Sequence, residues 1–215
     1  MNSPMKSGMN PAMNPGRRNF LWGAAVVIGG GSLGLGASQA LSLAAESGDP
    51  NGVFPNVALT SHEGNSYRFY DDLIRGKKVV INFFYAGCGD VCPLSTQRLV
   101  EVQRMLDGRV GRDMHMYSIT LQPELDTPEI MSGYVETYGV QPGWLFLRAS
   151  REDTDLLRRR LGFVDPDPDL DADIESHIGV VKFGNDAIGR WGACPSFADP
   201  EEIYATILSV DEKHA

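Results

Sequence analysis

Two cysteines, Cys88 and Cys92, are the side chains of this sequence best suited to chemistry. They lie in the segment AGCGDVCP, residues 86–93, between a β-branched and aromatic run and a helical pattern. Four positions apart at the start of a helix, their sulfurs can point to one side. Free N–H groups and the positive end of the helix dipole favour thiolate over thiol there. Such a pair can close a disulfide or hold a soft metal ion, and two merely structural buried cysteines are the alternative.

A histidine and a third cysteine fall near a predicted hairpin late in the chain. The segment GNDA, residues 184–187, separates two β-like segments. A turn centred on that segment pairs His177 with Cys194, and directly paired side chains share one face of a sheet. Without this pairing, His177 is more simply interpreted as an ordinary core or surface residue.

Alternating strand and helix patterns predict the frame that positions these residues. Apolar, β-branched and aromatic runs predict strands at residues 54–59, 67–69, 78–85, 114–121, 144–147, 178–183 and 188–191. Apolar residues at helical spacing, with capping residues at several ends, predict helices at 93–106, 127–138, 151–161 and 200–210. We therefore expect an α/β fold with a mostly parallel central sheet, helices on both faces and a C-terminal β-hairpin. Cys88 falls at the carboxyl edge of that sheet, where ligands bind in such folds.

Residues 1–40 have the pattern of a bacterial export signal. Arg17-Arg18 opens a twin-arginine motif, and an apolar run rich in glycine and alanine follows, ending in small residues suited to cleavage. The run is about 17 residues long, at the short limit for a spanning helix, so an uncleaved N-terminal anchor is the alternative. We expect a protein in the periplasm, or anchored to face it, that touches the membrane only through this segment. Residues 41–52 are then a linker, and residues 53–215 form one domain.

The composition fits a soluble domain and argues against a nucleic-acid partner. The chain has 215 residues, of which 42% are hydrophobic and 22% charged, and its net charge is -9. Residues 41–215 carry 16 basic against 28 acidic side chains. Because so acidic a body repels phosphate backbones, we expect no binding of nucleic acid. Three cysteines are too few for a disulfide-stabilised scaffold.

Three further patterns have ordinary interpretations. Residues 165–175 alternate acids with prolines and apolar residues, which predicts an extended, solvated loop. Its functional alternatives are a docking arm for a basic partner or a field that attracts cations. Met114-His115-Met116 could bind copper, but it falls in a predicted strand, so we expect core packing. Three arginines at residues 158–160 stand at the end of a predicted helix, where their positive charges interact favourably with the negative end of the helix dipole.

The chain resembles the Sco/SenC family of thioredoxin-fold copper proteins. The resemblance rests on KKVVINF (77–83), CGDVCP (88–93), SIT (118–120) with DTPE (126–129), and a histidine ahead of the hairpin. It spans residues 53–210 and implies a thioredoxin-like fold. It also implies one copper ion bound by two cysteines and a histidine, for assembly of the binuclear copper centre of cytochrome c oxidase. By motif, these roles fall on Cys88, Cys92 and His177, with Asp90 in the same loop as a possible accessory residue.

The resemblance implies a copper chaperone rather than an enzyme. It would deliver copper, reduce thiols, or both, for a copper-accepting subunit of a respiratory oxidase or another copper or thiol protein. Two thiolates and one imidazole suit Cu(I) and permit Cu(II), whereas structural zinc usually has four protein ligands. The alternative is a thiol–disulfide oxidoreductase that uses Cys88 and Cys92 without an obligatory metal, although thioredoxin motifs have two intervening residues, not three. A thiol peroxidase is disfavoured, because no threonine directly precedes Cys88.

The sequence departs from the family pattern in three places. Gly89 follows the first cysteine where the family usually has proline, which loosens the loop. Gln122-Pro123-Glu124 replaces the usual Asp-Pro-Glu, and the missing acid is expected to alter copper affinity or redox behaviour. Cys194 is not part of the family pattern. It is a possible accessory residue, as a third sulfur ligand or a resolving thiol, or else a passive side chain.

Overall fold

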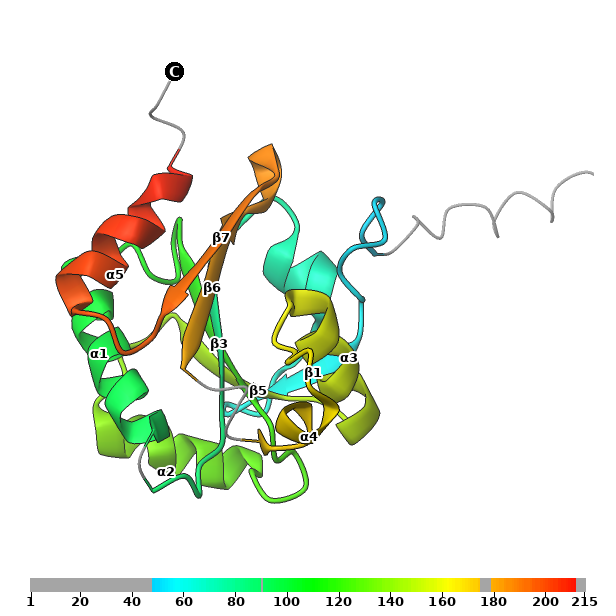
Figure 1. Ribbon diagram of the computed structural model, residues 1–215. Coiled ribbons are helices and arrows are strands. Elements are labelled where there is room, and N and C mark those ends of the chain that lie inside the picture. The colour runs from blue at the N-terminus through cyan, green and yellow to red at the C-terminus, as the bar shows by residue number, and fades with distance from the viewer. Residues whose placement is uncertain (1–47, 90, 175–178, 212–215) are drawn as a thin grey trace, which may run out of the picture. The chain divides into compact units, whose positions relative to one another are not determined.

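The structure is a computed structural model that describes residues 48–89, 91–174 and 179–211 (Figure 1). The chain divides into two units, Met1–Leu43 and Ala44–Ala215, and the described residues all belong to the second. The predicted export signal or anchor, residues 1–40, lies outside the described residues. Within the described ranges, no helix is both long enough and apolar enough to cross a membrane.

A seven-stranded mixed sheet forms the centre of the described unit, in the order β2-β1-β5-β4-β3-β6-β7. The strands are β1 (Ala58–Ser61), β2 (Ser66–Arg68), β3 (Lys78–Phe84), β4 (His115–Thr120), β5 (Trp144–Arg148), β6 (Val180–Asn185) and β7 (Arg190–Pro195). β3, β4 and β5 run parallel to one another, whereas the remaining neighbours pair antiparallel. The predicted parallel sheet is therefore confined to these three central strands, because antiparallel strands extend it on both sides.

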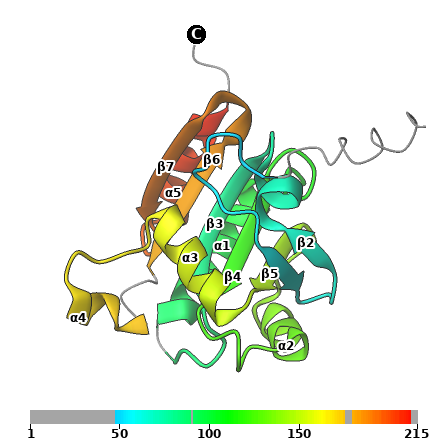
Figure 2. The same cartoon turned by 90° about the vertical axis from the view of Figure 1, so that its right-hand side faces the viewer.

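Helices cover both faces of the sheet, as predicted. The α-helices are α1 (Val91–Met105), α2 (Pro128–Tyr138), α3 (Arg151–Leu161), α4 (Pro168–Asp171) and α5 (Pro200–Ile207). Shorter helical turns are η1 (Phe69–Ile74), η3 (Asp186–Ile188) and η4 (Leu208–Val210). Figures 1 and 2 show α1 and α5 on one face and α3 on the other. This arrangement follows from the parallel strands, because each must be joined to the next by a crossover, usually a helix.

The ends of α2 and α3 follow the capping residues of the sequence. The Thr127 side chain accepts a hydrogen bond from the Ile130 N–H at the start of α2, and Gly139 ends it with φ 64°. Ser150 and Gly162 have the same roles at the two ends of α3. The predicted limits of both helices are therefore confirmed.

The core lies on both faces of the three parallel strands. Phe84 of β3 and Phe146 of β5 pack edge to face, with ring centroids 4.9 Å apart. Met114 and Met116 are at most 1% exposed, which confirms the core packing predicted for the Met-His-Met segment. The hydrophobic patterns of these strands thus correctly identified buried surface.

A row of buried, hydrogen-bonded polar side chains crosses the same three strands. The Trp144 Nε1–H donates to Ser118 Oγ at 2.9 Å, and the Ser118 hydroxyl donates to Asn82 Oδ1 at 2.7 Å. All three side chains are at most 4% exposed. Because unpaired polar atoms at this depth would be costly, these two hydrogen bonds favour one alignment of β3, β4 and β5.

The C-terminal hairpin has a different register from the predicted one. Asn185 pairs with Arg190 across a four-residue loop, so Cys194 pairs with Val181 and not with His177. The expected turn residue Asn185 instead ends β6, where its buried side chain donates to the Val210 carbonyl at 3.0 Å. The prediction was therefore wrong by four positions. His177 itself lies outside the described residues.

Trp191 of β7 lies directly against the backbone of β6. A Cβ added at Gly184 would come within 2.1 Å of the Trp191 ring. The Phe54 ring also packs against Trp191, and the two ring centroids are 4.7 Å apart. The hairpin and the first described segment of the chain are therefore packed together through one half-buried indole.

The acidic segment is anchored to the domain. Arg158 of α3 is 5% exposed, and its guanidinium donates to both carboxylate oxygens of Asp171 at 2.6 and 3.0 Å. It also donates to the Phe163 carbonyl at 2.8 Å. The segment includes the helix α4, so the prediction of an extended chain was wrong there, whereas most of its described residues are exposed, as the prediction of a solvated segment requires. The cause is a contact with α3 that the local pattern of acids and prolines does not reveal.

Candidate metal centre

The turn from β3 to α1 carries Cys88 and Cys92 at the carboxyl edge of the sheet. β3 ends at Phe84, and Cys92 is the second residue of α1. Between them, the Cys88 N–H donates to the Tyr85 carbonyl at 3.2 Å and closes a tight turn. Cys88 is 7% exposed and Cys92 2% exposed. The predicted placement of the cysteines, at a strand-to-helix turn, is confirmed.

The two cysteines contact each other through the first turn of α1. The Cys92 N–H donates to the Cys88 sulfur at 3.3 Å. A sulfur at this position receives one of the N–H groups that a helix start leaves without an intrahelical acceptor. Both residues carry thiols, so the turn offers two sulfur donors to one side of the sheet edge.

Burial controls the protonation of Cys92. It raises the pKa of the Cys92 thiol to about 12, and the nearby Cys88 and Asp126 act in the same direction, while a backbone hydrogen bond from Tyr85 opposes them. Cys92 is therefore a neutral thiol near neutral pH. Burial therefore opposes the preference for thiolate that was expected at a helix start.

A buried carboxylate, Asp126, connects this turn to the end of β4. Asp126 is 2% exposed, and its two oxygens accept the Ala86 N–H at 3.3 and 3.2 Å. The Thr120 hydroxyl donates to the same carboxylate, while Thr120 Oγ1 accepts the Gln122 N–H at 2.9 Å. Asp126 belongs to the DTPE segment but was not predicted to be a site residue. The signal that could have identified it is an acid directly before a helix cap, at the same sheet edge as the cysteine turn.

The other predicted site residues are not brought to the cysteine turn by the described structure. His177 and Asp90 lie outside the described residues, so their roles stay predictions. Cys194 is a half-buried residue of β7, and burial raises the pKa of its thiol. In the described part of the chain, no three His, Cys, Asp or Glu side chains are grouped as a metal site requires. Cys194 therefore does not form a three-sulfur cluster with Cys88 and Cys92 there.

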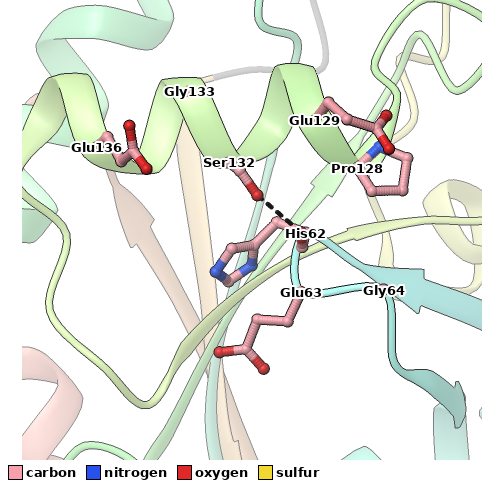
Figure 3. A pocket seen from close by; sticks show the side chains of 8 residues that line it. All are labelled: His62, Glu63, Gly64, Pro128, Glu129, Ser132, Gly133 and Glu136. Carbon is pink, nitrogen blue, oxygen red and sulfur yellow. Dashed lines mark hydrogen bonds between the residues drawn. The ribbon is translucent and has the colours of Figure 1, made fainter.

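A separate hollow of about 430 Å³ lies between α2 and the turn after β1 (Figure 3). The Ser132 hydroxyl donates to the His62 carbonyl at 2.8 Å, and His62 Nδ1 accepts the Phe146 N–H at 3.2 Å. Burial lowers the pKa of His62, consistent with a neutral imidazole that keeps Nδ1 free to accept. The lining residues are His62, Glu63, Gly64, Pro128, Glu129, Ser132, Gly133 and Glu136. The hollow contains no cysteine and is distinct from the cysteine turn.

The chemistry of the cysteine turn fits a soft metal ion. Two sulfurs within one helical turn select soft ions such as Cu(I), and an imidazole is a suitable third ligand. The same two sulfurs, once oxidised to a disulfide, could not bind the ion, because metal binding requires deprotonated thiols. Metal binding and thiol oxidation therefore compete for Cys88 and Cys92.

Comparisons with known proteins give the same family as the sequence motifs. The family model SCO1/SenC matches residues 47–145. Human Protein SCO1 homolog, mitochondrial, is 30% identical over 103 residues, which are 47% of this chain and 33% of that protein. Bovine Protein SCO2 homolog, mitochondrial, is 33% identical over 98 residues, 45% of this chain and 35% of that protein. These matches span about a third of the length of the two relatives.

Solved structures share the fold. The crystal structure of yeast Sco1 has a TM-score of 0.58 at 18% identity and covers 74% of this chain and 94% of its own. The structure of Bradyrhizobium japonicum ScoI with copper bound has a TM-score of 0.55 at 24% identity and covers 72% and 96%. The fold and the buried cysteine pair define a thioredoxin-like dithiol protein, as predicted. Together with the sequence matches, they confirm the resemblance of this chain to the SCO1/SenC family.

Proposed function

We propose that the protein is an exported copper chaperone that binds one copper ion through Cys88, Cys92 and His177. The observation that carries the proposal is the pair of buried sulfurs in one turn at the carboxyl edge of the sheet. Copper as the cargo is supported by relatives whose structures contain it, including yeast and Bradyrhizobium japonicum Sco proteins. His177 is included as a ligand because of its position in the sequence pattern that resembles the Sco/SenC family.

Binding at this turn exchanges protons for the metal ion. Cys92 starts as a buried neutral thiol, and only a cation compensates the loss of its proton at that depth. Two sulfurs and one imidazole leave copper three-coordinate, in either oxidation state that the site accepts. A ligand of the acceptor protein can then join before a cysteine leaves, so the ion need not be released into water.

The acceptor is a copper-binding subunit of a respiratory oxidase, in assembly of the binuclear copper centre of cytochrome c oxidase. The resemblance to the SCO1/SenC family supports this partner, and the protein acts on it as copper donor, thiol reductant or both. Another copper or thiol protein is the alternative acceptor. The twin-arginine pattern in residues 1–40 supports export, with the segment either cleaved or retained as an anchor facing the periplasm.

A thiol–disulfide oxidoreductase is the second candidate. The specific observation in its favour is the N–H of Cys92 directed at Cys88, because this bond stabilises a thiolate on Cys88. That thiolate would attack a substrate disulfide, and Cys92 would then resolve the mixed disulfide and release a dithiol product. The raised pKa of Cys92 is a cost to either function, because the resolving step and metal binding both require its thiolate.

Anaerobic copper titration of the reduced protein distinguishes the two candidates. We expect His177→Ala to lower copper affinity more than about tenfold, since even groups outside the ligand set change metal affinity 10–100-fold. Disulfide reduction should be unchanged in the same variant, and His214→Ala serves as the matched histidine control. X-ray absorption should count two sulfurs and one nitrogen on copper. Wild-type affinity in His177→Ala, or fewer than two sulfurs, would contradict the ligand assignment.

A further inference from the structure

Asp126 is a buried anion in direct contact with the turn that carries Cys88. Its contacts, the Ala86 N–H and the Thr120 hydroxyl, both donate to its oxygens. Thr120 Oγ1 already accepts the Gln122 N–H, so its own proton is directed at Asp126. Both contacts therefore use the oxygens of Asp126 as hydrogen-bond acceptors, which is the role of a carboxylate.

The carboxylate joins the ends of two parallel strands beside the cysteines. Phe84 at the end of β3 pairs with Thr120 at the end of β4, and the Leu121 N–H donates to the Phe84 carbonyl at 2.8 Å. Asp126 adds a second link beyond this ladder, from Thr120 to Ala86. Because Ala86 is two residues before Cys88, the link sets the direction in which the chain enters the cysteine turn.

Among the residues that the structure describes, no basic side chain forms an ion pair with Asp126. The hydrogen-bond donors to its oxygens there are a backbone N–H and a hydroxyl, which are neutral. At 2% exposure it is poorly screened by water. It accepts the Ala86 N–H, two residues before Cys88, so its charge lies close to the cysteine turn. A fixed negative charge at that range stabilises a doubly charged ion more than a singly charged one.

We propose that Asp126 is a positioning residue that holds the cysteine turn and whose charge biases a copper ion bound there toward Cu(II). The copper part of this inference rests on the proposed function. It concerns the ratio of two binding affinities and therefore needs no electron donor. Asp126 is thus a buried acid beside the cysteine turn in a chain that has Gln122, and not an acid, shortly after β4.

The test compares charge with hydrogen bonding in the full-length protein. Asp126→Asn removes the charge, Asp126→Glu restores it, and Thr120→Val removes one donor while keeping the charge. Glu129→Gln, an exposed acid three residues away, is the matched control. For each, Cu(II) and Cu(I) affinities are measured by competition with chelators, and exchange of the Ala86 amide hydrogen reports the position of the turn. The double variant T120V/D126N replaces Asp126→Asn if the latter does not fold, because it removes the hydroxyl donor that the new amide NH2 group would face.

We expect Asp126→Asn to lower the ratio of Cu(II) to Cu(I) affinity about tenfold, the effect of one poorly screened unit charge at short range. For a one-electron couple this is a rise of about 59 mV in reduction potential. Asp126→Glu, Thr120→Val and Glu129→Gln should keep the wild-type ratio, while Ala86 exchange should speed up in Asp126→Asn. Equal shifts in Thr120→Val and Asp126→Asn would overturn the charge argument, and so would an unchanged ratio in Asp126→Asn.

A metal-free measurement separates this inference from the proposed function. Cys88 and Cys92 are alkylated at one pH with anionic iodoacetate and with neutral iodoacetamide. Removing the repelling charge should raise the rate ratio, iodoacetate over iodoacetamide, about threefold in Asp126→Asn and not in Glu129→Gln. If wild type binds no copper but this ratio rises, the function fails and the charge of Asp126 stands. If copper binds and neither ratio changes, the inference fails and the function stands.

Discussion

Replacing Asp171 with asparagine tests whether the acidic segment is anchored by a buried ion pair. The side chain of Arg158 is 6% exposed and that of Asp171 is 23% exposed, with the closest oxygen at 2.6 Å. Asp171 Oδ1 also accepts the Asp165 N–H at 2.9 Å. Asp171→Asn therefore removes an anionic partner 2.6 Å from a buried guanidinium that also has Asp155 at 3.8 Å, and it weakens the turn that begins the segment.

The expected cost follows from these contacts. Hydrogen bonds to charged groups contribute about 1.5–3 kcal/mol each, and removing one partner of a fully buried ion pair costs about 3–5 kcal/mol. Asp171 is partly exposed, the asparagine carbonyl can still accept one bond, and Arg158 keeps its bond to Phe163. We therefore expect the free energy of unfolding to fall by about 2 kcal/mol, which lowers Tm by about 4–8 °C in a domain of this size.

Urea denaturation followed by circular dichroism provides the measurement, with Asp169→Asn as the control. Asp169 is an exposed acid on the same short helix, so its replacement removes the same charge without the buried contact. The control should change the free energy of unfolding by less than about 0.5 kcal/mol. If Asp171→Asn costs no more than the control, α4 is not anchored by Arg158 and the reasoning is refuted.

Two other predictions concern a histidine and two glycines. Burial lowers the pKa of His62 below its ordinary value of 6.5, so the folded state favours the neutral imidazole. The contribution of this neutral imidazole to the free energy of unfolding is complete above about pH 6.5 and is lost as pH falls through the folded-state pKa. His62→Gln should flatten part of this decline in urea denaturation between about pH 7.5 and 5, and an unchanged slope would count against a neutral buried imidazole. Gly184→Ala should cost about 1–3 kcal/mol in the free energy of unfolding, because the new methyl group collides with Trp191. Gly133 is an interior residue of α2 with open space around an added Cβ, so Gly133→Ala should instead stabilise the fold by about 0.5–1 kcal/mol. Equal thermal stability of the two variants would contradict the packing described.

Local signals in the sequence were sufficient for the elements that position the cysteines. The buried run that became β3 and the proline-containing start of α1 predicted a strand-to-helix turn, and Cys88 and Cys92 lie in it. The limits of α3 were predicted to the residue, because Ser150 and Gly162 act on the backbone directly beside them. Such interactions involve near neighbours in the chain, so the sequence pattern contains them.

Contacts between distant residues were not predictable in the same way. The hairpin register depends on the burial of Asn185 against the Val210 carbonyl, 25 residues later. The fold of the acidic segment depends on Arg158, which looked like one of three similar arginines at a helix end. Asp126 acquires its role only when β3 and β4 align and bring Ala86 within reach. In each case the deciding partner is fixed by tertiary packing.

The two tryptophans in the described residues give the domain two fluorescent reporters at different depths. Trp144 is 1% exposed and hydrogen-bonded in the centre of the sheet, whereas Trp191 is a half-buried residue between Gly184 and Phe54. Solvent reaching Trp191 first would shift emission before the signal of Trp144 changes. With Trp22 replaced by phenylalanine, a single emission series during unfolding would therefore reveal whether the hairpin detaches before the parallel strands separate.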